Sequence, residues 1–365
     1  MRSSTSSSES SAALSKLDRA LPARPLRASA WIGLFIMIAL VSGWEMYWRD
    51  YGSVPSYRNS ASLWAIERRR IDNGEGDKTV ISGSSRMLFN TQPDTWEQES
   101  GERPIQLSLE GTSPVGLMED LAADDDFTGT LLVGVAPGLF FSGFEYRRKA
   151  FDRYKNESPT QWIGQQISML VEPYLAFYHY DFALFQVLER QPFPPRTDVE
   201  NPIDVRRLTV VEKDRSTRMW DKLETDPEYA AVAQQIWAHG FEPYDELDEE
   251  EIEKNLESRA KQIERAVAAT NALREKGAEV IFVRNPAEGH YAIREPTYNP
   301  RAETWDVLIE KTGALGIHWM DHEALQGFWL PEWSHIAGSE ADRYTKALYE
   351  VIQTERKLRN AKSAE

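Results

Sequence analysis

A long apolar segment, Ala28 to Trp48, constrains this chain more than any other feature of its sequence. Glu45 is the only charged residue in it and lies near its far end. The segment has the roughly 20 residues that an α-helix needs to cross the hydrocarbon core of a bilayer. Trp31 near one end and Tyr47 near the other match the aromatic belts of membrane interfaces. We therefore expect one transmembrane helix over residues 28–48.

The residues before this segment set its predicted orientation. Residues 1–27 are rich in serine near their start and end with Lys16, Arg19, Arg24 and Arg27, as in a disordered basic tail. Because basic flanks stay in the cytoplasm, we expect the remainder of the chain on the outer side of the membrane. A cleaved signal peptide is the alternative. The length of the segment and the lack of an Ala-x-Ala site favour an uncleaved, single-pass signal anchor.

Composition excludes several kinds of site. The 365-residue chain has no cysteine, so it has no disulfide, no thiol nucleophile and no cysteine-based metal site. Its formal charge of -16 disfavours binding to nucleic acid, because most of its surface would repel phosphates. One acidic run, Glu242 to Glu257, is interpreted as a solvated loop leading into a helix, with a metal-binding loop as the alternative.

Strand and helix patterns alternate through the rest of the chain. Five apolar runs are predicted as strands, at residues 78–83, 104–111, 129–137, 278–286 and 316–321. Helices are predicted near residues 115–121, 251–276, 305–311 and 338–357. This alternation favours an α/β sandwich over residues 78–357, built on a five-stranded, mostly parallel sheet. Residues 49–77 are expected to form a juxtamembrane segment, and residues 358–365 a disordered tail.

A large insertion at about 142–250 separates the third and fourth strands and is predicted to be helical. Its apolar stretch is broken by Glu172 and Pro173, which argues against a second membrane span. Its aromatic residues are interpreted as core plus partner surface, with the membrane as an alternative contact. They are Trp162, Tyr174, Phe177, Tyr178, Tyr180 and Phe182.

Hydroxyl groups follow the first predicted strand, in the turn Gly83-Ser84-Ser85-Arg86. Carboxyl ends of parallel strands are where active sites gather in such sheets. A serine nucleophile needs a base, and His335 lies three residues after Glu332, a spacing that lets the carboxylate orient the imidazole. The structural alternative is that Ser84 or Ser85 caps the helix that follows.

These motifs together resemble the SGNH/GDSL hydrolase superfamily. The resemblance implies a flavodoxin-like three-layer sandwich with Ser85 as nucleophile and the Ser85 and Gly111 N–H groups as oxyanion donors. It also implies His335 as base and Glu332 as its acid, with Glu where Asp is usual. The chain departs from the family after the third strand, where Gly134 to Gly138 contain no Asn. Such a departure is similar to membrane-anchored members that acylate bacterial cell-envelope polymers.

The predicted function is therefore a membrane-anchored, extracytoplasmic serine esterase or O-acyltransferase of SGNH type, acting without a cofactor. The resemblance implies a cell-envelope polysaccharide or related acyl ester as substrate and a multi-spanning membrane acyltransferase as possible partner. It also implies an anchor in the inner (cytoplasmic) membrane of a bacterium, with the C-terminal domain in the periplasm or at the cell exterior. The rival prediction is a catalytically degenerate assembly or binding protein of an envelope polysaccharide system, which the missing Asn and the Glu332 substitution favour.

Further charged residues follow the strands. Arg86 and Arg284 are candidates for binding an anionic substrate, with ordinary ion pairs to neighbouring carboxylates as the alternative for both. Asp321 competes with Glu332 as the acid behind His335. A metal site formed by Asp321 with His318 and His322 lacks supporting spacing, and none is predicted.

Overall fold

The computed structural model describes residues 26–189, 207–239 and 248–363, and the chain divides into two compact units, Met1–Asp50 and Tyr51–Glu365. Residues 1–25 of the predicted basic tail, the start of the acidic run and the final two residues lie outside the described residues, whereas residues 26 and 27 of that tail begin helix α2. In the first unit, helix α2 (Leu26–Asp50) contains the predicted span. It is long and apolar enough to be a membrane anchor or a signal sequence. Glu45 forms an ion pair with Arg49 at 2.5 Å.

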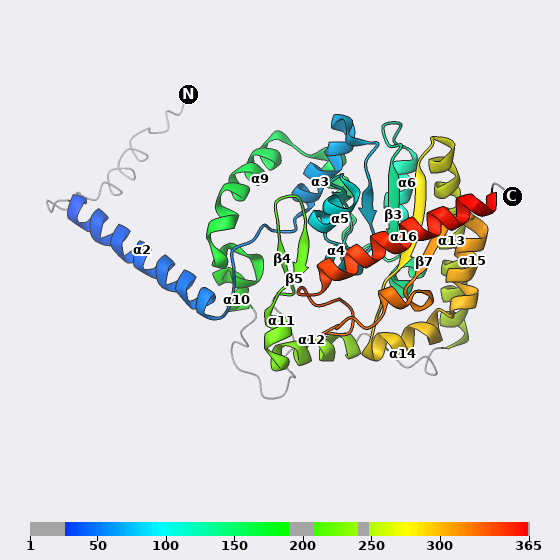
Figure 1. The fold of residues 1–365 in the computed structure, drawn as a ribbon. Helices are drawn as coiled ribbons and strands as arrows, with labels where there is room; N and C mark the ends of the chain where they lie inside the picture. The colour runs from blue at the N-terminus through cyan, green and yellow to red at the C-terminus, as the bar shows by residue number, and fades with distance from the viewer. Residues whose placement is uncertain (1–25, 190–206, 240–247, 364–365) are drawn as a thin grey trace, which may run out of the picture. The chain divides into compact units, whose positions relative to one another are not determined.

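A five-stranded parallel sheet forms the centre of the second unit, as predicted (Figure 1). Its strand order is β2-β1-β3-β6-β7. The strands are β1 (Val80–Ser82), β2 (Ile105–Gln106), β3 (Thr130–Gly134), β6 (Glu279–Arg284) and β7 (Leu315–His318). Strand β2 is shorter than predicted, although the Leu107 and Leu109 N–H groups still donate to the β1 side at Ile81 and Gly83. Because all five strands are parallel, their carboxyl ends meet at one edge of the sheet.

Both faces of the sheet are buried by helices, which explains the continuous apolar runs of its strands. Along β3, Leu131 and Val133 belong to one core and Leu132 to the other. The first core is covered by α3 (Ala61–Arg70), α6 (Val115–Ala122), α7 (Pro137–Ser142), α13 (Glu249–Glu275) and α15 (Trp305–Thr312). The second is covered by α4 (Ser85–Asn90), α5 (Pro93–Ser100) and α16 (Ala341–Ser363).

The structure extends the predicted α/β domain, residues 78–357, at both of its ends. Residues 358–363 were expected in a disordered tail, but α16 continues through them to Ser363. The segment before β1 packs into the unit, because Trp64 of α3 is fully buried in the first core and its indole N–H donates to the Leu107 carbonyl at 2.9 Å. A π-helical turn, η1 (Ile71–Glu75), joins α3 to β1.

The insertion is helical, as predicted, but it also contains an antiparallel hairpin that the sequence did not reveal. Its helices are α8 (Lys149–Asn156), α9 (Pro159–Val171), η2 (Glu172–Tyr174), η3 (Ala176–Tyr178), η4 (Tyr180–Phe182), α10 (Leu184–Glu189), α11 (Lys222–Thr225) and α12 (Pro227–His239). The hairpin pairs β4 (Thr209–Val211) with β5 (Thr217–Met219). Later short helices are α14 (Gly289–Tyr298), η6 (Arg301–Glu303), η7 (Trp319–Asp321) and η8 (Glu323–Leu325).

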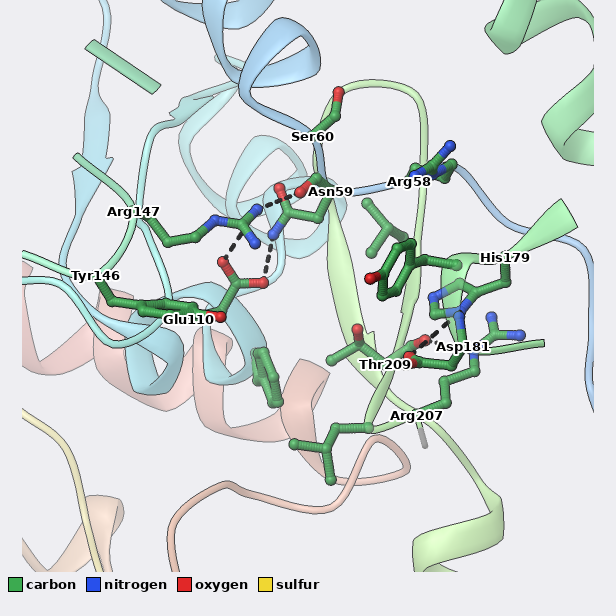
Figure 2. Close-up of a pocket in the computed structure, with 14 residues that line it drawn as sticks. Arg58, Asn59, Ser60, Glu110, Tyr146, Arg147, His179, Asp181, Arg207 and Thr209 are labelled. Carbon is green, nitrogen blue, oxygen red and sulfur yellow. Dashed lines mark hydrogen bonds and ion pairs between the residues drawn. The ribbon is translucent and has the colours of Figure 1, made fainter. Parts of the chain in front are cut away.

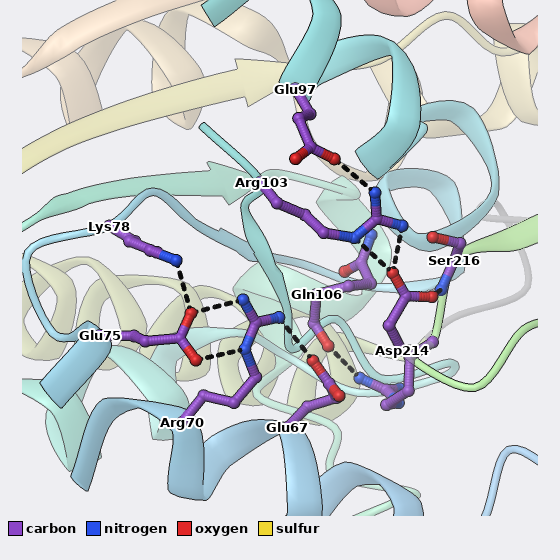
Figure 3. Close-up of polar contacts among 10 residues, drawn as sticks. Glu67, Arg70, Glu75, Lys78, Glu97, Arg103, Gln106, Asp214 and Ser216 are labelled. Atoms are coloured by element: carbon purple, nitrogen blue, oxygen red, sulfur yellow. Dashed lines mark hydrogen bonds and ion pairs between the residues drawn. The ribbon is translucent and has the colours of Figure 1, made fainter. Parts of the chain in front are cut away.

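Arginine side chains connect the hairpin to the edge of the sheet through hydrogen bonds (Figure 3). Arg215, at its tip, is fully buried and donates to the carbonyls of Gln106 and Ser108 at 2.6 and 2.7 Å. Burial lowers the pKa of this guanidinium to about 10. Arg103 donates twice to Asp214, at 2.9 and 2.5 Å. Side chains of the insertion therefore cover the edge strand β2 and the residues that flank it. The same contacts place the chain around β4 near the carboxyl edge of the sheet.

Gly83 lets β1 turn into α4 against its neighbour β3. Its φ is +152°, and a Cβ there would lie 2.6 Å from Met87 Cγ and 3.2 Å from Gly134 Cα. We expect Gly83→Ala to lower the free energy of unfolding by about 1–3 kcal/mol, measured as a drop in the thermal midpoint of the full chain. Gly138→Ala is the matched control, because Gly138 has open space around its Cβ position and lies in helix α7. Equal midpoints for the two variants would contradict this account of the turn.

Candidate active site

The predicted nucleophile turn lies at the carboxyl edge of the sheet, between the loops that follow β2 and β3. Ser84 is the N-cap residue of α4, yet its side chain makes no capping hydrogen bond. Ser85 is the first helical residue and lines a pocket of about 470 Å³. The side-chain capping alternative therefore has no support from Ser84. Ser84 also lines the pocket but is buried, and Ser85 is the more exposed of the two serines.

A buried carboxylate holds the histidine. Glu332 Oε1 accepts hydrogen bonds from the His335 backbone N–H and ring Nδ1, both at 2.7 Å. Its Oε2 accepts from the Trp237 indole N–H at 2.5 Å. Glu332 is fully buried and His335 nearly so. The backbone and indole N–H groups require an acceptor. With Glu332 as a carboxylate the ring contact is a donation from Nδ1–H, which leaves Nε2 as the basic nitrogen.

The short loop that makes this contact is strained. Trp333, between the two residues, has a φ of +72°, which is uncommon for a bulky side chain. Its carbonyl accepts from the Glu288 N–H at 2.8 Å, and its ring lies against His290. These contacts hold the backbone in the left-handed conformation that lets Glu332 fold back onto His335.

Helix α4 holds the histidine loop as well as the serine. The Phe89 and His335 rings are stacked, with centroids 4.2 Å apart. Asn90 Oδ1 accepts from the Ile336 N–H at 3.0 Å, and the Asn90 carbonyl accepts from Thr345 of α16 at 3.1 Å. The serine and the histidine are thus positioned by one short helix.

The pocket brings Ser85, Gly111 and His335 together. His335 Nε2 is buried and makes no hydrogen bond within the part of the chain that the structure describes. No hydrogen bond joins it to Ser85 in those residues either. Buried ring nitrogens without a partner are rare, because the lost hydration is not replaced. A basic nitrogen without a partner, in the same pocket as a serine, is an arrangement from which a hydroxyl can lose its proton when a substrate enters.

The two candidate arginines share one carboxylate. Glu295 of α14 is buried and pairs with Arg86 at 2.7 Å and, by a short contact, with Arg284. Burial opposes the charge of Glu295, yet the two guanidiniums keep the pKa of this carboxyl below its usual range. Burial together with the nearby Arg86 charge lowers the pKa of Arg284, although Glu295 opposes this effect. Two cations around one anion give this cluster a net charge of +1, and the nearby Glu332 carboxylate also interacts with Arg86.

Only one of these arginines lines the serine pocket. Arg86 lines it with a buried Nη1 that lacks a partner among the described residues. Arg284 lines a neighbouring apolar pocket of about 370 Å³, which shares Tyr291 and Glu295 with the first. The ion-pair alternative therefore describes both arginines in this structure.

A third pocket, also of about 470 Å³, adjoins the serine pocket through Phe89, Glu110, Tyr146 and Leu208 (Figure 2). It is polar and contains three arginines, Arg58, Arg147 and Arg207. Arg147 and Asn59 converge on Glu110 in Figure 2. Within the described ranges Arg207 pairs with no carboxylate and donates to neutral oxygens such as Ser53 Oγ and Ser56 Oγ. Burial lowers its pKa to about 10.

Asp321, the alternative acid, is not placed behind His335. Both of its oxygens accept from Arg301 at 2.7 Å. His318 is buried at the end of β7 and His322 follows Asp321, but no group of three or more His, Asp or Glu suited to a metal occurs in the described residues.

Sequence reasoning missed Trp237, Tyr291 and Glu295, since none of them lies at a strand end.

The chain was compared with protein-family models and with curated proteins. No family model matches it, and no curated protein matches it.

We expect Glu332→Gln to lower the free energy of unfolding by about 3 kcal/mol, because an amide group would face a donor inside the core. Chemical unfolding of the full chain at neutral pH measures this loss. Glu323→Gln, at an exposed position of η8, should change it by less than about 0.5 kcal/mol. A Glu332→Gln protein as stable as the Glu323→Gln control would show that these three hydrogen bonds are not formed.

Burial of the His318 imidazole predicts that the stability of the fold depends on pH. Burial lowers the pKa of this imidazole from its usual value to about 4. Between about pH 4 and 6.5 the unfolded chain therefore binds a proton that the folded chain does not, and stability falls as the pH falls through that window. We expect His318→Gln to remove up to about 1.4 kcal/mol per pH unit of that slope, measured by denaturant unfolding from pH 4 to 7. His322→Gln is the control, and an equal effect of both variants would contradict the assignment.

Proposed function

We propose that this protein is a membrane-anchored, extracytoplasmic serine esterase or O-acyltransferase of SGNH type. The observation that carries the proposal is the His335 ring, which lies in the wall of the pocket that Ser85 lines. Glu332 holds the ring at Nδ1, and Nε2 has no hydrogen-bond partner among the described residues. Strand order supports the same reading, because β2-β1-β3-β6-β7 is the order of flavodoxin-like sandwiches.

The proposed reaction has two steps. In the first, Ser85 Oγ attacks the acyl carbonyl while His335 Nε2 takes the hydroxyl proton, and Nε2 then protonates the departing alcohol. In the second, water or an acceptor hydroxyl loses its proton to Nε2 and attacks the acyl-Ser85 ester, which returns the serine. Glu332 stays ionised throughout and stabilises the imidazolium that forms in each step.

Negative charge on the carbonyl oxygen needs stabilisation in both steps. The backbone N–H groups of Ser85 and Gly111 are the proposed donors, and Gly111, with a φ of +58°, lines the pocket. Residues 136–138 take the place of the Asn that SGNH enzymes have after the third strand, and Ala136 and Gly138 line the pocket. We propose that the net positive charge of Arg86, Arg284 and Glu295 offsets the loss of that amide.

The neighbouring pockets support a substrate with two different parts. The arginine-containing pocket of Figure 2 suits a hydroxyl-rich or anionic saccharide. The pocket beyond Tyr291 is apolar and suits an acyl group or another hydrophobic part. A cell-envelope polysaccharide or a related acyl ester combines these properties, and α2 would keep the unit at the inner-membrane surface. A multi-spanning acyltransferase is the proposed partner that supplies acyl groups across the membrane.

The test is labelling of the full chain, in detergent or lipid, with a fluorophosphonate probe that reacts with activated serines. We expect labelling of the wild type, none of Ser85→Ala, and a rate lower by about 10²-fold or more for His335→Gln, since the base is lost. Ser84→Ala is the matched control and should be labelled like the wild type, because Ser84 makes no side-chain hydrogen bond to α4.

The second candidate is a catalytically degenerate assembly or binding protein on the same fold. Two observations favour it: the residues after β3 provide no amide side chain, and no hydrogen bond joins Ser85 to His335 in the described residues. A folded wild-type protein that is not labelled, or a Ser85→Ala protein that still is, would reject the enzymatic proposal in favour of this one.

A further inference from the structure

Helix α9 turns apolar side chains away from the protein. Ile163, Ile167 and Leu170 are 50%, 58% and 73% exposed, and they follow the i, i+4, i+7 spacing of one helix face. No charged residue occurs anywhere in the helix, Pro159–Val171. A surface helix of a soluble protein normally has the reverse arrangement, with its apolar face on the core.

The opposite face of α9 contacts the protein through both polar and apolar side chains. Gln165 and Met169 are buried, and Gln165 Oε1 accepts from Ser60 Oγ at 2.9 Å. Ser168 donates to Glu172 at 2.6 Å, and Glu172 accepts from the Arg58 N–H at 3.0 Å. These contacts fix the rotation of the helix, so the outward apolar face is built into the fold.

The same flank continues through the rest of the aromatic insertion. The exposed apolar side chains of α9, η2 and α10, which we call the apolar flank, are Trp162, Ile163, Ile167, Leu170, Tyr174, Leu184, Phe185 and Leu188. Figure 1 shows α9 and α10 following each other along one side of the unit. Of the aromatic residues interpreted as core plus partner surface, Phe182 is fully buried, whereas Trp162, Tyr174 and Tyr180 are exposed.

The chain enters the unit beside this flank. Tyr51 is its first residue, and the Tyr51 ring contacts Phe182 of η4 with centroids 6.2 Å apart. One peptide bond separates Tyr51 from Asp50, the last residue of α2. If α2 spans a bilayer, the covalent connection alone brings the part of the unit around Phe182 to the membrane surface, whatever the orientation of α2.

We propose that the apolar flank lies in the interfacial layer of the same bilayer that α2 spans. Tryptophan and tyrosine at headgroup depth, with Ile, Leu and Phe directed to the acyl chains, are the pattern of helices that lie in this layer. The covalent tether makes the interaction intramolecular, so a modest apolar area is enough to hold it. The proposal rests on the membrane anchor of the proposed function but not on its chemistry.

The absence of native cysteine makes the test direct. Full-length Ile167→Cys and Leu170→Cys proteins, each labelled with an NBD fluorophore, are placed in lipid nanodiscs containing spin-labelled lipid. We expect their fluorescence to be quenched about twofold or more, because both positions would contact lipid. Met37→Cys in α2 is the positive control, and Leu256→Cys on α13, which is 48% exposed, is the aqueous control.

Each other outcome overturns the proposal. Labels on the flank that are quenched no more than the Leu256 label, while the Met37 label is quenched, would mean that the flank is free in water and serves a protein partner instead. An unquenched Met37 label would mean that α2 is not in the bilayer, and would reject the membrane anchor as well. Neither result changes fluorophosphonate labelling of Ser85, so failure of this proposal is distinguishable from failure of the enzymatic one.

Discussion

One buried carboxylate, Glu332, organises the site. It accepts three hydrogen bonds, two from His335 and one from Trp237. The first two fold the loop before α16, and the third joins that loop to the insertion. A buried carboxylate is stable only when its oxygens accept hydrogen bonds, so the histidine loop and the insertion, which supply the donors, must both be folded around it.

Buried arginines repeat this requirement around the carboxyl edge of the sheet. Arg215 is stabilised by carbonyls at the edge strand, and Arg207 by neutral oxygens around Ser53 and Ser56. Arg86 and Arg284 share Glu295. In a low-dielectric interior these contacts are costly to lose on one side only. The edge of the sheet that carries the pockets is therefore also a region of buried arginines whose hydrogen bonds and ion pairs must all be made for the fold to be stable.

The sequence predicts the central sheet well because strands buried on both faces have apolar runs that need no long-range information. The candidate site is predicted in part. The spacing of Glu332 and His335 indicates their contact, yet only the fold separates Glu332 from Asp321, which Arg301 engages. The hairpin β4–β5 was missed because its strands are short. The sequence leaves the aromatic stripe as core plus partner surface, because periodicity marks an apolar face without saying which way that face points.

The docking of α4 has a consequence for the order of assembly. Residues of α4 near the start of the unit contact the histidine loop and Thr345 of α16 near its end, with sequence separations of 246 and 255 residues for the Asn90 contacts. Contacts between residues so far apart in the sequence form late in folding, because the entropy lost on closing the intervening chain must be offset by structure already formed. A growing chain consequently has the serine turn long before it has the pocket. Any chemistry that depends on both is withheld until the last helix has been synthesised and has packed.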